Sequence, residues 1–233
     1  MSATLTRASA ALRDLVTFVL PQRCPGCGVE ADPARMLCGR CLAAIPRLET
    51  ALCVRCLAAG SAQPSGCLRH PAYASYARWI YDERAAPVIH ALKYGERTVL
   101  AAALGREMAG ALPPGTRPDL VVEVPLHPTR RRERGYNQAA LLAEALAGAI
   151  GAPRLPDALT RVRATRTQAR LGPAERRRNM AGAFRVNHPE ALAGRSVLIV
   201  DDVLTTGATL ESALRALAAA GADARGLVLA WAA

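Results

Sequence analysis

The sequence has almost no lysine and few aromatic residues. Lys93 is the single lysine among 30 basic residues, so arginine supplies nearly all of the positive charge. Aromatic residues make up 4% of the 233 residues, while alanine and leucine dominate. This composition argues against an all-β sandwich and favours helices packed on a sheet. Arginine is a good ligand for phosphate, and the net charge of +11 predicts an anionic partner such as nucleic acid, a phosphorylated metabolite or a membrane surface.

The sequence also lacks an apolar stretch long enough to span a bilayer. Residues 5–20 come closest, but Arg7, Arg13 and Asp14 interrupt them, and the small-residue cleavage site of an exported protein is missing. We interpret residues 1–20 as an amphipathic helix and expect a cytoplasmic protein without a transmembrane segment. Disulfides are rare in that compartment, so the seven cysteines indicate a metal site.

Beyond residue 67 there is no further cysteine, and the seven cysteines and one histidine form four pairs with two-residue gaps. The pairs are Cys24 and Cys27, Cys38 and Cys41, Cys53 and Cys56, and Cys67 and His70. This gap allows both ligands of a knuckle to bind one tetrahedral zinc ion at about 2.3 Å. The spacing predicts two closed, structural sites, formed by residues 24/27/38/41 and 53/56/67/70, although an interleaved pairing stays open. Whether the second site is filled depends on His70.

The composition changes near residue 72, which predicts a double zinc ribbon over residues 21–72 and a second domain over residues 73–233. Apolar alternation in this second part predicts strands that alternate with helices, and hence an α/β fold with a doubly wound, mostly parallel sheet. The expected strands are residues 78–81, 119–124, 159–163, 196–200 and 226–231, the expected helices are 87–93, 98–112, 138–150 and 209–220, and a basic loop is expected over 125–136.

A turn rich in acids and threonines follows the apolar run at residues 197–200. Asp201 and Asp202 come first, and Thr205, Thr206, Gly207, Ala208 and Thr209 then open a helix. A glycine turn, threonine hydroxyls and helix amides suit a phosphate, and adjacent carboxylates suit vicinal hydroxyls. Together they predict a site for a ribose 5-phosphate at the carboxyl end of a strand. The alternative is an ordinary surface turn with an acidic helix cap.

Residues 197–209 closely resemble the phosphoribosyl-pyrophosphate signature of type I phosphoribosyltransferases. With the cysteine module in front, the whole chain resembles the ComF family, a competence-associated group with a phosphoribosyltransferase-like fold. Residues 89–94, 124–138 and 168–184 support this narrower match. The visible departure is His70, at a position where the family usually has a cysteine.

The resemblance implies a role for each matching segment. Asp201 and Asp202 would be the catalytic residues that hold the ribose hydroxyls, residues 205–209 would bind the 5-phosphate, and Mg²⁺ would bridge the diphosphate and the ribose. The implied pyrophosphate loop contains Pro125, Leu126, His127, Arg130 and Arg131. The implied flexible loop, which would cover the substrate and reach across a homodimer interface, contains Arg163, Arg166, Gln168 and Arg170.

Two functions follow from this resemblance, and the residues leave both open. In one, the protein binds phosphoribosyl pyrophosphate and assists the handling of single-stranded DNA in natural transformation, with a competence helicase or the uptake machinery as partner. In the other, it transfers ribose 5-phosphate to an unidentified acceptor and releases pyrophosphate. Lys93 is either a site residue or a chance occurrence. Trp79 and Tyr136 are candidates for stacking on bases, and about half of the arginines are expected to form an ordinary solvated surface.

Overall fold

The computed structural model describes residues 22–32, 36–57, 60, 67, 69–94, 98–162, 175 and 180–233. The amphipathic helix expected over residues 1–20 lies outside these residues, and so does the expected flexible loop with Arg163, Arg166, Gln168 and Arg170. Within the described part of the chain, no helix combines the length and the apolar character that crossing a bilayer requires.

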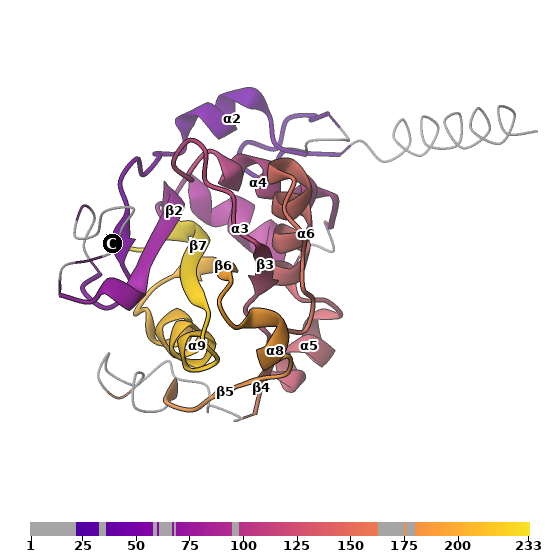
Figure 1. The fold of residues 1–233 in the computed structure, drawn as a ribbon. Coiled ribbons are helices and arrows are strands. Elements are labelled where there is room, and N and C mark those ends of the chain that lie inside the picture. The colour runs from indigo at the N-terminus through magenta and orange to yellow at the C-terminus, as the bar shows by residue number, and fades with distance from the viewer. Residues whose placement is uncertain are drawn as a thin grey trace, which may run out of the picture.

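A five-stranded sheet forms the centre of the molecule (Figure 1). Its strands are β1 (Leu52–Cys53), β2 (Ala74–Ile80), β3 (Leu120–Glu123), β6 (Ser196–Leu204) and β7 (Asp223–Trp231). They are ordered β1-β2-β7-β6-β3. β2, β7, β6 and β3 are parallel to one another, and β1 pairs antiparallel with β2. The predicted parallel sheet is therefore present, with one antiparallel strand at its edge.

Helices cover both faces of this sheet, as in a doubly wound fold (Figure 1). The face with the larger helical cover carries α3 (Ala85–Tyr94), α4 (Thr98–Ala109) and α6 (Gln138–Ile150), and the opposite face carries α9 (Ala208–Ala219). The remaining elements are α2 (Gly39–Ala44), the 3₁₀ helix η1 (Pro71–Tyr73), α5 (Pro128–Arg134), α8 (Pro189–Leu192), and a separate two-stranded sheet of β4 (Leu159–Arg161) and β5 (Phe184–Val186).

Alternate residues of β6 supply the two layers of the core. Leu198 and Val200 belong to a buried cluster that includes residues of α3, α4 and α6. Val197 and Ile199 belong to a second cluster that includes residues of α9. Because successive side chains of a strand point to opposite faces, a strand buried on both sides reads as a continuous apolar run. The run at residues 197–200 thus gives a correct prediction of a central strand.

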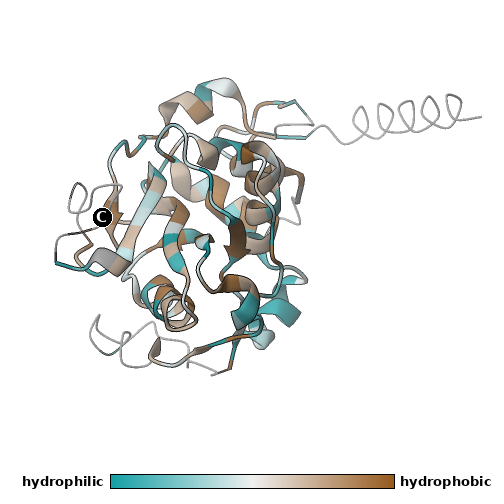
Figure 2. Cartoon of the chain, in the orientation of Figure 1, coloured by the Kyte–Doolittle hydropathy of each residue, from teal (hydrophilic) through white to brown (hydrophobic). Residues whose placement is uncertain are grey.

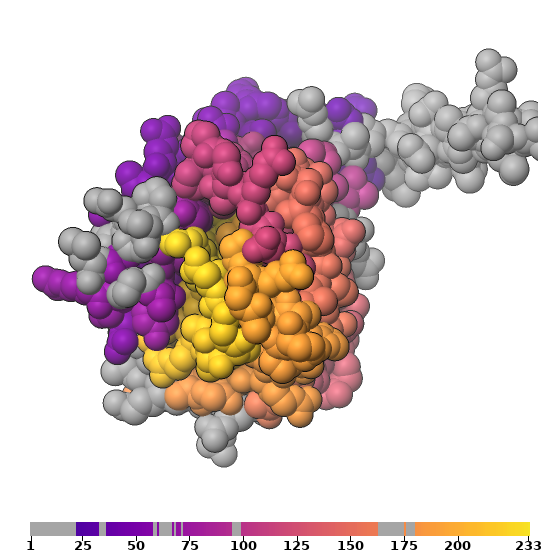
Figure 3. Space-filling view, viewed as in Figure 1, coloured from indigo at the N-terminus to yellow at the C-terminus, as the bar shows by residue number. Residues whose placement is uncertain are grey.

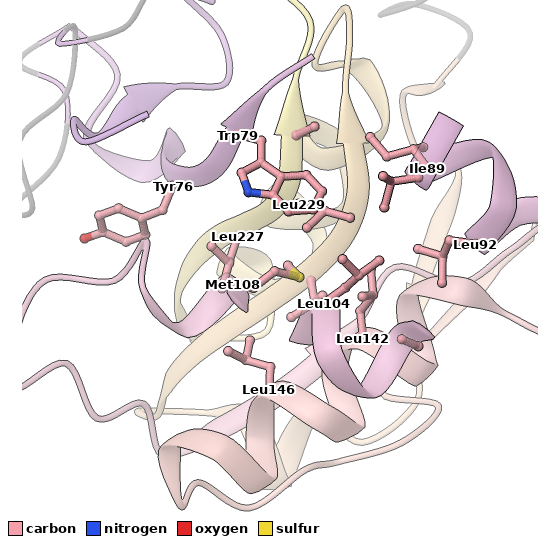
Figure 4. Close-up of a cluster of buried hydrophobic side chains, with 14 of the residues drawn as sticks. Tyr76, Trp79, Ile89, Leu92, Leu104, Met108, Leu142, Leu146, Leu227 and Leu229 are labelled. Atoms are coloured by element: carbon pink, nitrogen blue, oxygen red, sulfur yellow. The ribbon is translucent and has the colours of Figure 1, made fainter. Parts of the chain in front are cut away.

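Trp79 lies in the first of these clusters and is 0% exposed. Figure 4 shows its ring beside Leu229 and close to Met108 of α4. The prediction that Trp79 stacks on a base is therefore wrong, because the ring is inside the core. Tyr136 has a structural contact of its own, since its hydroxyl donates a hydrogen bond to the carbonyl oxygen of Leu92 at 2.6 Å.

Two segments differ from the elements that the sequence predicts. The expected basic loop over residues 125–136 contains α5, which begins at Pro128 and ends before Gly135 in the left-handed conformation. A helix this short and this polar has no apolar stripe by which a pattern could reveal it. The expected strand near residues 159–163 is β4, but it pairs antiparallel with β5 and lies outside the central sheet.

The N-terminal module is joined to the central sheet by backbone hydrogen bonds. β1 belongs to the cysteine-rich segment and pairs with the first residues of β2. Further along, the N–H of Leu48 donates to the carbonyl of Arg78, and the N–H of Ile80 donates to the carbonyl of Pro46. In the space-filling view the purple surface of this module borders the yellow C-terminal segments (Figure 3). The domain boundary near residue 72 stays a prediction, and it falls between two strands that pair.

Candidate functional site

Two adjacent carboxylates lie near the carboxyl end of the central strand. The sequence predicts a strand that ends at Val200, but β6 continues to Leu204 because β7 pairs with it as far as Trp231. Asp201 and Asp202 therefore belong to the strand itself, and the chain turns only after them. Asp202 is 6% exposed, whereas Asp201 is half-buried. Neighbouring strand residues face opposite ways, so the two carboxylates have different surroundings.

The turn that follows β6 has the features of a phosphate-binding loop. Gly207 has φ +74° and immediately precedes the first residue of α9. Such a φ favours glycine, and a glycine provides no side-chain cap for the first N–H groups of the helix. Helix amides and threonine hydroxyls at one turn favour an anion. A small hollow beside Asp201 is lined by Thr205, Thr206, Gly207, Ala208 and Thr209.

A cavity of about 390 Å³ extends from this turn across the ends of the strands. Its charged and amide lining comes from β6, α3, α5, α6 and β4, and consists of Asp201, Asp202, Lys93, Arg130, Arg134, Gln138 and Arg161. Thr205 and Thr209 line it beside the carboxylates. Parallel strands end at one edge of a sheet, and ligands of doubly wound folds bind there. The cavity lies at that edge.

Asp202 is held in place by two helices from the same face of the sheet. Its Oδ2 lies 3.2 Å from the Nζ of Lys93, at the end of α3. The same oxygen accepts a hydrogen bond at 2.9 Å from the Nε2 of Gln138, the first residue of α6. Gln138 is 3% exposed. A buried carboxylate requires such partners, and these contacts fix the position of Asp202 in the cavity wall.

Asp201 has a different electrostatic environment. Burial raises the pKa of Asp201 to about 7, the neighbouring charge of Asp202 adds to the rise, and Lys93 and Arg161 oppose it. Burial also lowers the pKa of Arg161, and the positive charge of Arg130 lowers it further. Two guanidinium groups that repel each other therefore lie near one carboxylate. An anionic ligand between them would relieve the repulsion, and arginine binds phosphate groups bidentately.

The structure divides the residues of the implied pyrophosphate loop into two sets. Pro125, Leu126 and Arg130 line the cavity. His127 instead caps α5, where its Nδ1 accepts a hydrogen bond at 3.3 Å from the backbone N–H two residues later. Arg131 lies exposed on α5 and is absent from the cavity wall. The two arginines separate because successive residues of a helix point about 100° apart.

Three residues of the cavity are hard to recognise in the sequence. Lys93 and Gln138 fall within the segments 89–94 and 124–138 that support the family resemblance, but the resemblance assigns neither of them a role, and Arg161 carries no motif. Gln138 has one usable signal, since it is a buried polar residue at the first position of an otherwise apolar helix. Arg161 reaches the cavity from β4, outside the central sheet, and no spacing rule predicts that.

The cysteines and His70 form two clusters, each with four possible metal ligands. In each cluster the ligand atoms all lie within 4.8 Å of one another. The clusters are Cys24, Cys27, Cys38 and Cys41, and Cys53, Cys56, Cys67 and His70. Consecutive knuckles therefore pair in chain order, and the interleaved pairing does not describe the fold.

The geometry of both clusters suits tetrahedral zinc. Zinc–sulfur bonds of about 2.3 Å place ligand atoms about 3.8 Å apart. The Sγ atoms of Cys27 and Cys38 are 3.7 Å apart, and those of Cys56 and Cys67 are 3.9 Å apart. The Nδ1 of His70 lies 3.2 Å from the Sγ of Cys56, so His70 occupies the position of a fourth ligand. All seven cysteines are free of disulfides.

The first cluster already favours thiolates. Burial raises the pKa of Cys24, but hydrogen bonds from the backbone N–H groups of the two knuckles outweigh it and lower the pKa to about 6. Burial and the neighbouring thiols raise the pKa of Cys41. A bound cation with a double positive charge would favour the thiolate form of every cysteine in the cluster. The sites have four protein ligands each, as structural zinc sites do.

Comparisons with known families agree with this geometry. Residues 136–233 match the model of the phosphoribosyl transferase domain, and residues 15–69 match the model of the double zinc ribbon domain. The structure of glutamine phosphoribosylpyrophosphate amidotransferase from B. subtilis is a weak neighbour, with 22% identity and a TM-score of 0.41 over 59% of this chain and 29% of that one. Fold and site together define a double zinc ribbon followed by a domain with the phosphoribosyltransferase fold.

Similar proteins identify the family of the chain more narrowly. The chain is 34% identical over 207 residues to the DNA utilization protein YhgH of Escherichia coli, and the match covers 86% of this chain and 80% of that protein. It is also 37% identical over 107 residues to Competence protein F of Haemophilus influenzae, and this match covers 46% of this chain and 47% of that protein. The chain belongs to the ComF family.

Proposed function

We propose that the cavity binds phosphoribosyl pyrophosphate together with Mg²⁺. One observation carries this proposal: a single cavity is lined by Asp201, by Thr205 and Thr209 of the turn after β6, and by arginines from two separate segments, Arg130 and Arg134 of α5 and Arg161 of β4. In the proposed complex, Asp201 and Asp202 hold the ribose hydroxyls and residues 205–209 hold the 5-phosphate. Arg130 and Arg161 hold the diphosphate. Mg²⁺ prefers oxygen ligands from carboxylates and substrate phosphates, and when bound it would neutralise part of the diphosphate charge.

A calorimetric titration with phosphoribosyl pyrophosphate and Mg²⁺ tests this site. Arg130 and Arg131 are neighbours on α5, but only Arg130 lines the cavity, so they form a matched pair. We expect Arg130→Gln to weaken binding at least tenfold, and Arg131→Gln to change it less than twofold. The absence of binding heat with the unchanged protein would contradict the proposal, and so would equal effects of the two substitutions.

We further propose that the protein assists the handling of single-stranded DNA in natural transformation. The names of the relatives, DNA utilization protein and Competence protein F, support this role. So does α5, whose ribbon has the colour of hydrophilic residues in Figure 2. Arg131 and Arg132 lie exposed on that helix, and the guanidinium of Arg134 lies 4.8 Å from the ring centre of Tyr94, which is 60% exposed. Exposed arginines and an exposed aromatic ring suit a nucleic-acid backbone and its bases.

Binding of oligothymidylate at several salt concentrations tests this second role. Each phosphate contact contributes about −0.7 to the slope of log K against log salt for single strands. We expect replacement of Arg131 and Arg132 by Gln to reduce the slope by about 1.4, with the affinity for phosphoribosyl pyrophosphate unchanged. A slope that is the same in the variant would contradict a role of α5 in DNA binding.

One observation favours the alternative, in which the protein is an active phosphoribosyltransferase. A carboxyl group with a pKa of about 7 in the cavity is suited to accept a proton near neutral pH. In this reaction an acceptor attacks the anomeric carbon, the bond to the diphosphate oxygen breaks, and pyrophosphate leaves with the electron pair. Asp201 takes the proton of the acceptor. Release of pyrophosphate in the presence of a nucleobase panel or oligonucleotide, lost in Asp201→Asn, would establish turnover.

The remaining parts of this proposal concern location and partners. We expect a cytoplasmic protein that receives the imported strand, with a competence helicase or the uptake machinery as partner and a homodimer as its assembly. Co-purification from a transformable host tests the partner, and light scattering of the pure protein tests the assembly. A monomer that retains no component of the uptake machinery would contradict the expected partner and the expected homodimer.

A further inference from the structure

The turn formed by residues 205–209, called the phosphate loop below, is in direct contact with the Cys53/Cys56 knuckle of the second zinc site. A Cβ atom added at Gly207 would lie 2.4 Å from the carbonyl oxygen of Val54 and 2.9 Å from its Cγ1. It would also lie 3.2 Å from the Cδ2 of Leu57. Val54 lies between the zinc ligands Cys53 and Cys56. Residues 53–57 therefore form the wall against which the loop turns.

Strand pairing, backbone hydrogen bonds and burial in the core hold this wall in place. β1 pairs residues 52–53 with residues 74–75 of the central sheet. The N–H of Val54 donates to the carbonyl of Tyr73 at 3.0 Å, and the N–H of Leu57 donates to the carbonyl of Cys53 at 2.8 Å. Val54 is 0% exposed and belongs to the same buried cluster as Ala208. The ligands on both sides of Val54 would fix this knuckle when the metal is bound.

An ion pair connects the same knuckle to the helix after the loop. The Nε of Arg55 lies 3.7 Å from the Oε1 of Glu211, whose side chain is 6% exposed. The backbone N–H of Glu211 donates to the carbonyl of Gly207 at 2.8 Å. Val54 thus contacts the phosphate loop, and the next residue, Arg55, contacts the first turn of α9. A displacement of this knuckle would change the position of the loop and of the helix start.

The first zinc site has a different location. Its ligand Cys41 lies on α2, which lies over α4 at the top of Figure 1, away from α9. Cys38 and Cys41 pack against the cluster that contains Trp79 and Leu104. The segment after α2 is joined to α4 by the contact between Arg47 and Glu107 at 3.4 Å. Cys53 and Cys67 of the second site also belong to this cluster, but it is residues 54–57 of the second site that contact the loop and α9.

From this difference we infer that sugar-phosphate binding depends on the metal of the second site and is independent of the metal of the first. Val54 is a positioning residue: it keeps the loop in the shape in which its amides meet a phosphate. The part of the inference that concerns ligand affinity rests on the proposed function. The part that concerns the order of the phosphate loop can be measured without any ligand.

Matched ligand substitutions test the inference. Cys27→Ser and Cys56→Ser each remove one exposed thiol, from the first and second site respectively. We expect each variant to lose about one of two zinc equivalents. Cys56→Ser should bind phosphoribosyl pyrophosphate at least tenfold more weakly, and the amides of residues 205–211 should exchange hydrogen faster. Cys27→Ser should retain the affinity within twofold and the exchange protection of the loop.

Val54→Ala provides a second variant that leaves all eight metal ligands unchanged. We expect it to keep both zinc equivalents, to weaken phosphoribosyl pyrophosphate binding and to speed exchange in residues 205–211. This variant decides the matter if Cys56→Ser does not fold. The inference would be overturned if the amides of residues 205–211 exchanged hydrogen at an unchanged rate in Val54→Ala and Cys56→Ser. It would also be overturned if Cys27→Ser had the same effects as Cys56→Ser. If the unchanged protein binds no phosphoribosyl pyrophosphate, the proposed function fails, while hydrogen exchange still tests the coupling.

Discussion

The carboxyl group of Asp201 lies in surroundings that oppose its ionisation. Burial and the adjacent charge of Asp202 raise its pKa from 3.8 to about 7. Between these two values the unfolded chain has released the proton and the folded chain still holds it. The free energy of unfolding therefore falls as the pH rises through this window. Asp201 thus lowers the stability of the fold at neutral pH, which is typical of a functional group.

Asp201→Asn removes this titration, so we expect the variant to be more stable than the unchanged protein above pH 7 and similar to it near pH 4. The gain in melting temperature should be about 2–4 °C per kcal/mol for a chain of this size. Thermal unfolding of both proteins, measured between pH 4 and pH 8, tests this pH-dependent gain in stability. A constant difference across that range would contradict the assignment.

Asp82 provides a control of opposite sign. Burial opposes its ionisation, but hydrogen bonds from Arg84 and the backbone lower its pKa. Its ionised form therefore stabilises the fold above the pKa of the unfolded chain, and that stability is lost as the pH falls through the folded value. Asp82→Asn should lower the melting temperature at pH 7 and have less effect in strong acid.

The contact between Lys93 and Asp202 predicts an energetic coupling. Lys93→Met removes the ion pair and leaves the buried carboxylate with hydrogen bonds from the Nε2 of Gln138 and from the backbone N–H of Val203. We expect a loss of about 1–3 kcal/mol, below the usual cost of breaking a fully buried pair because Lys93 is partly exposed. Asp202→Asn combined with Lys93→Met should cost less than the sum of the two single substitutions. Denaturant unfolding of the four proteins gives the coupling, and additive losses would contradict it.

Prediction from the sequence at this scale is possible where the chemistry is local. Two-residue gaps between cysteines predict the zinc knuckles, because ligands in one turn must share an ion. The acid pair and the threonine turn are likewise one continuous stretch of chain. Lys93, Gln138 and Arg161 reach the same cavity from three other elements. Their approach is set by how helices pack on the sheet, and spacing along the chain carries no information about it.

At the scale of elements, the predicted strands and helices are present, one expected loop contains the helix α5, and several ends differ. β6 is longer than predicted because its partner β7 continues beside it, which a single-strand pattern does not contain. α6 begins where predicted, since the side chain of Asn137 accepts a hydrogen bond from the N–H of Ala139. α5 was predicted as a loop because seven mostly charged residues lack a hydrophobic face. Pairing partners and short polar helices are therefore the parts that the sequence pattern leaves undetermined.

Two helical glycines make opposite predictions. A Cβ at Gly105 of α4 would lie 2.4 Å from the Cβ of Ala145 and 2.9 Å from the carbonyl oxygen of Leu142, both on α6. We expect Gly105→Ala to cost about 1–3 kcal/mol, because the two helices would have to separate. Gly148 of α6 is exposed, with nothing within 4 Å of an added Cβ.

Gly148→Ala should therefore stabilise the protein by about 0.5–1 kcal/mol, the usual advantage of alanine inside a helix. Chemical denaturation measures both substitutions. Equal effects of the two would show that α4 and α6 do not approach each other as closely as the structure shows.

At the scale of the whole molecule, the zinc ribbon and the phosphoribosyltransferase domain share a sheet and a core. β1 forms the edge of the sheet, and Leu52 and Val54 belong to the buried cluster that includes Leu204 and Leu210. Removal of zinc by a chelator should therefore lower the melting temperature of the entire chain. We expect a shift of at least about 5 °C, equivalent to about 2 kcal/mol.

Circular dichroism in the far ultraviolet, which follows all helices, provides the measurement. The metal-bound protein should unfold in one transition, and so should the metal-free protein, at a lower temperature. A chelated protein whose helices melt at the unchanged temperature would indicate that the ribbon contributes nothing to the stability of the second domain.

The position of β1 has a consequence for the order of events on the ribosome. β1 and β2 are neighbours in the chain, whereas β7, the other partner of β2, is made last. An unpaired strand edge in a growing chain invites aggregation. A ribbon that has already captured zinc can pair with β2 as soon as that strand emerges and shield one edge until synthesis finishes. In zinc-starved cells we therefore expect nascent chains to be lost before they mature.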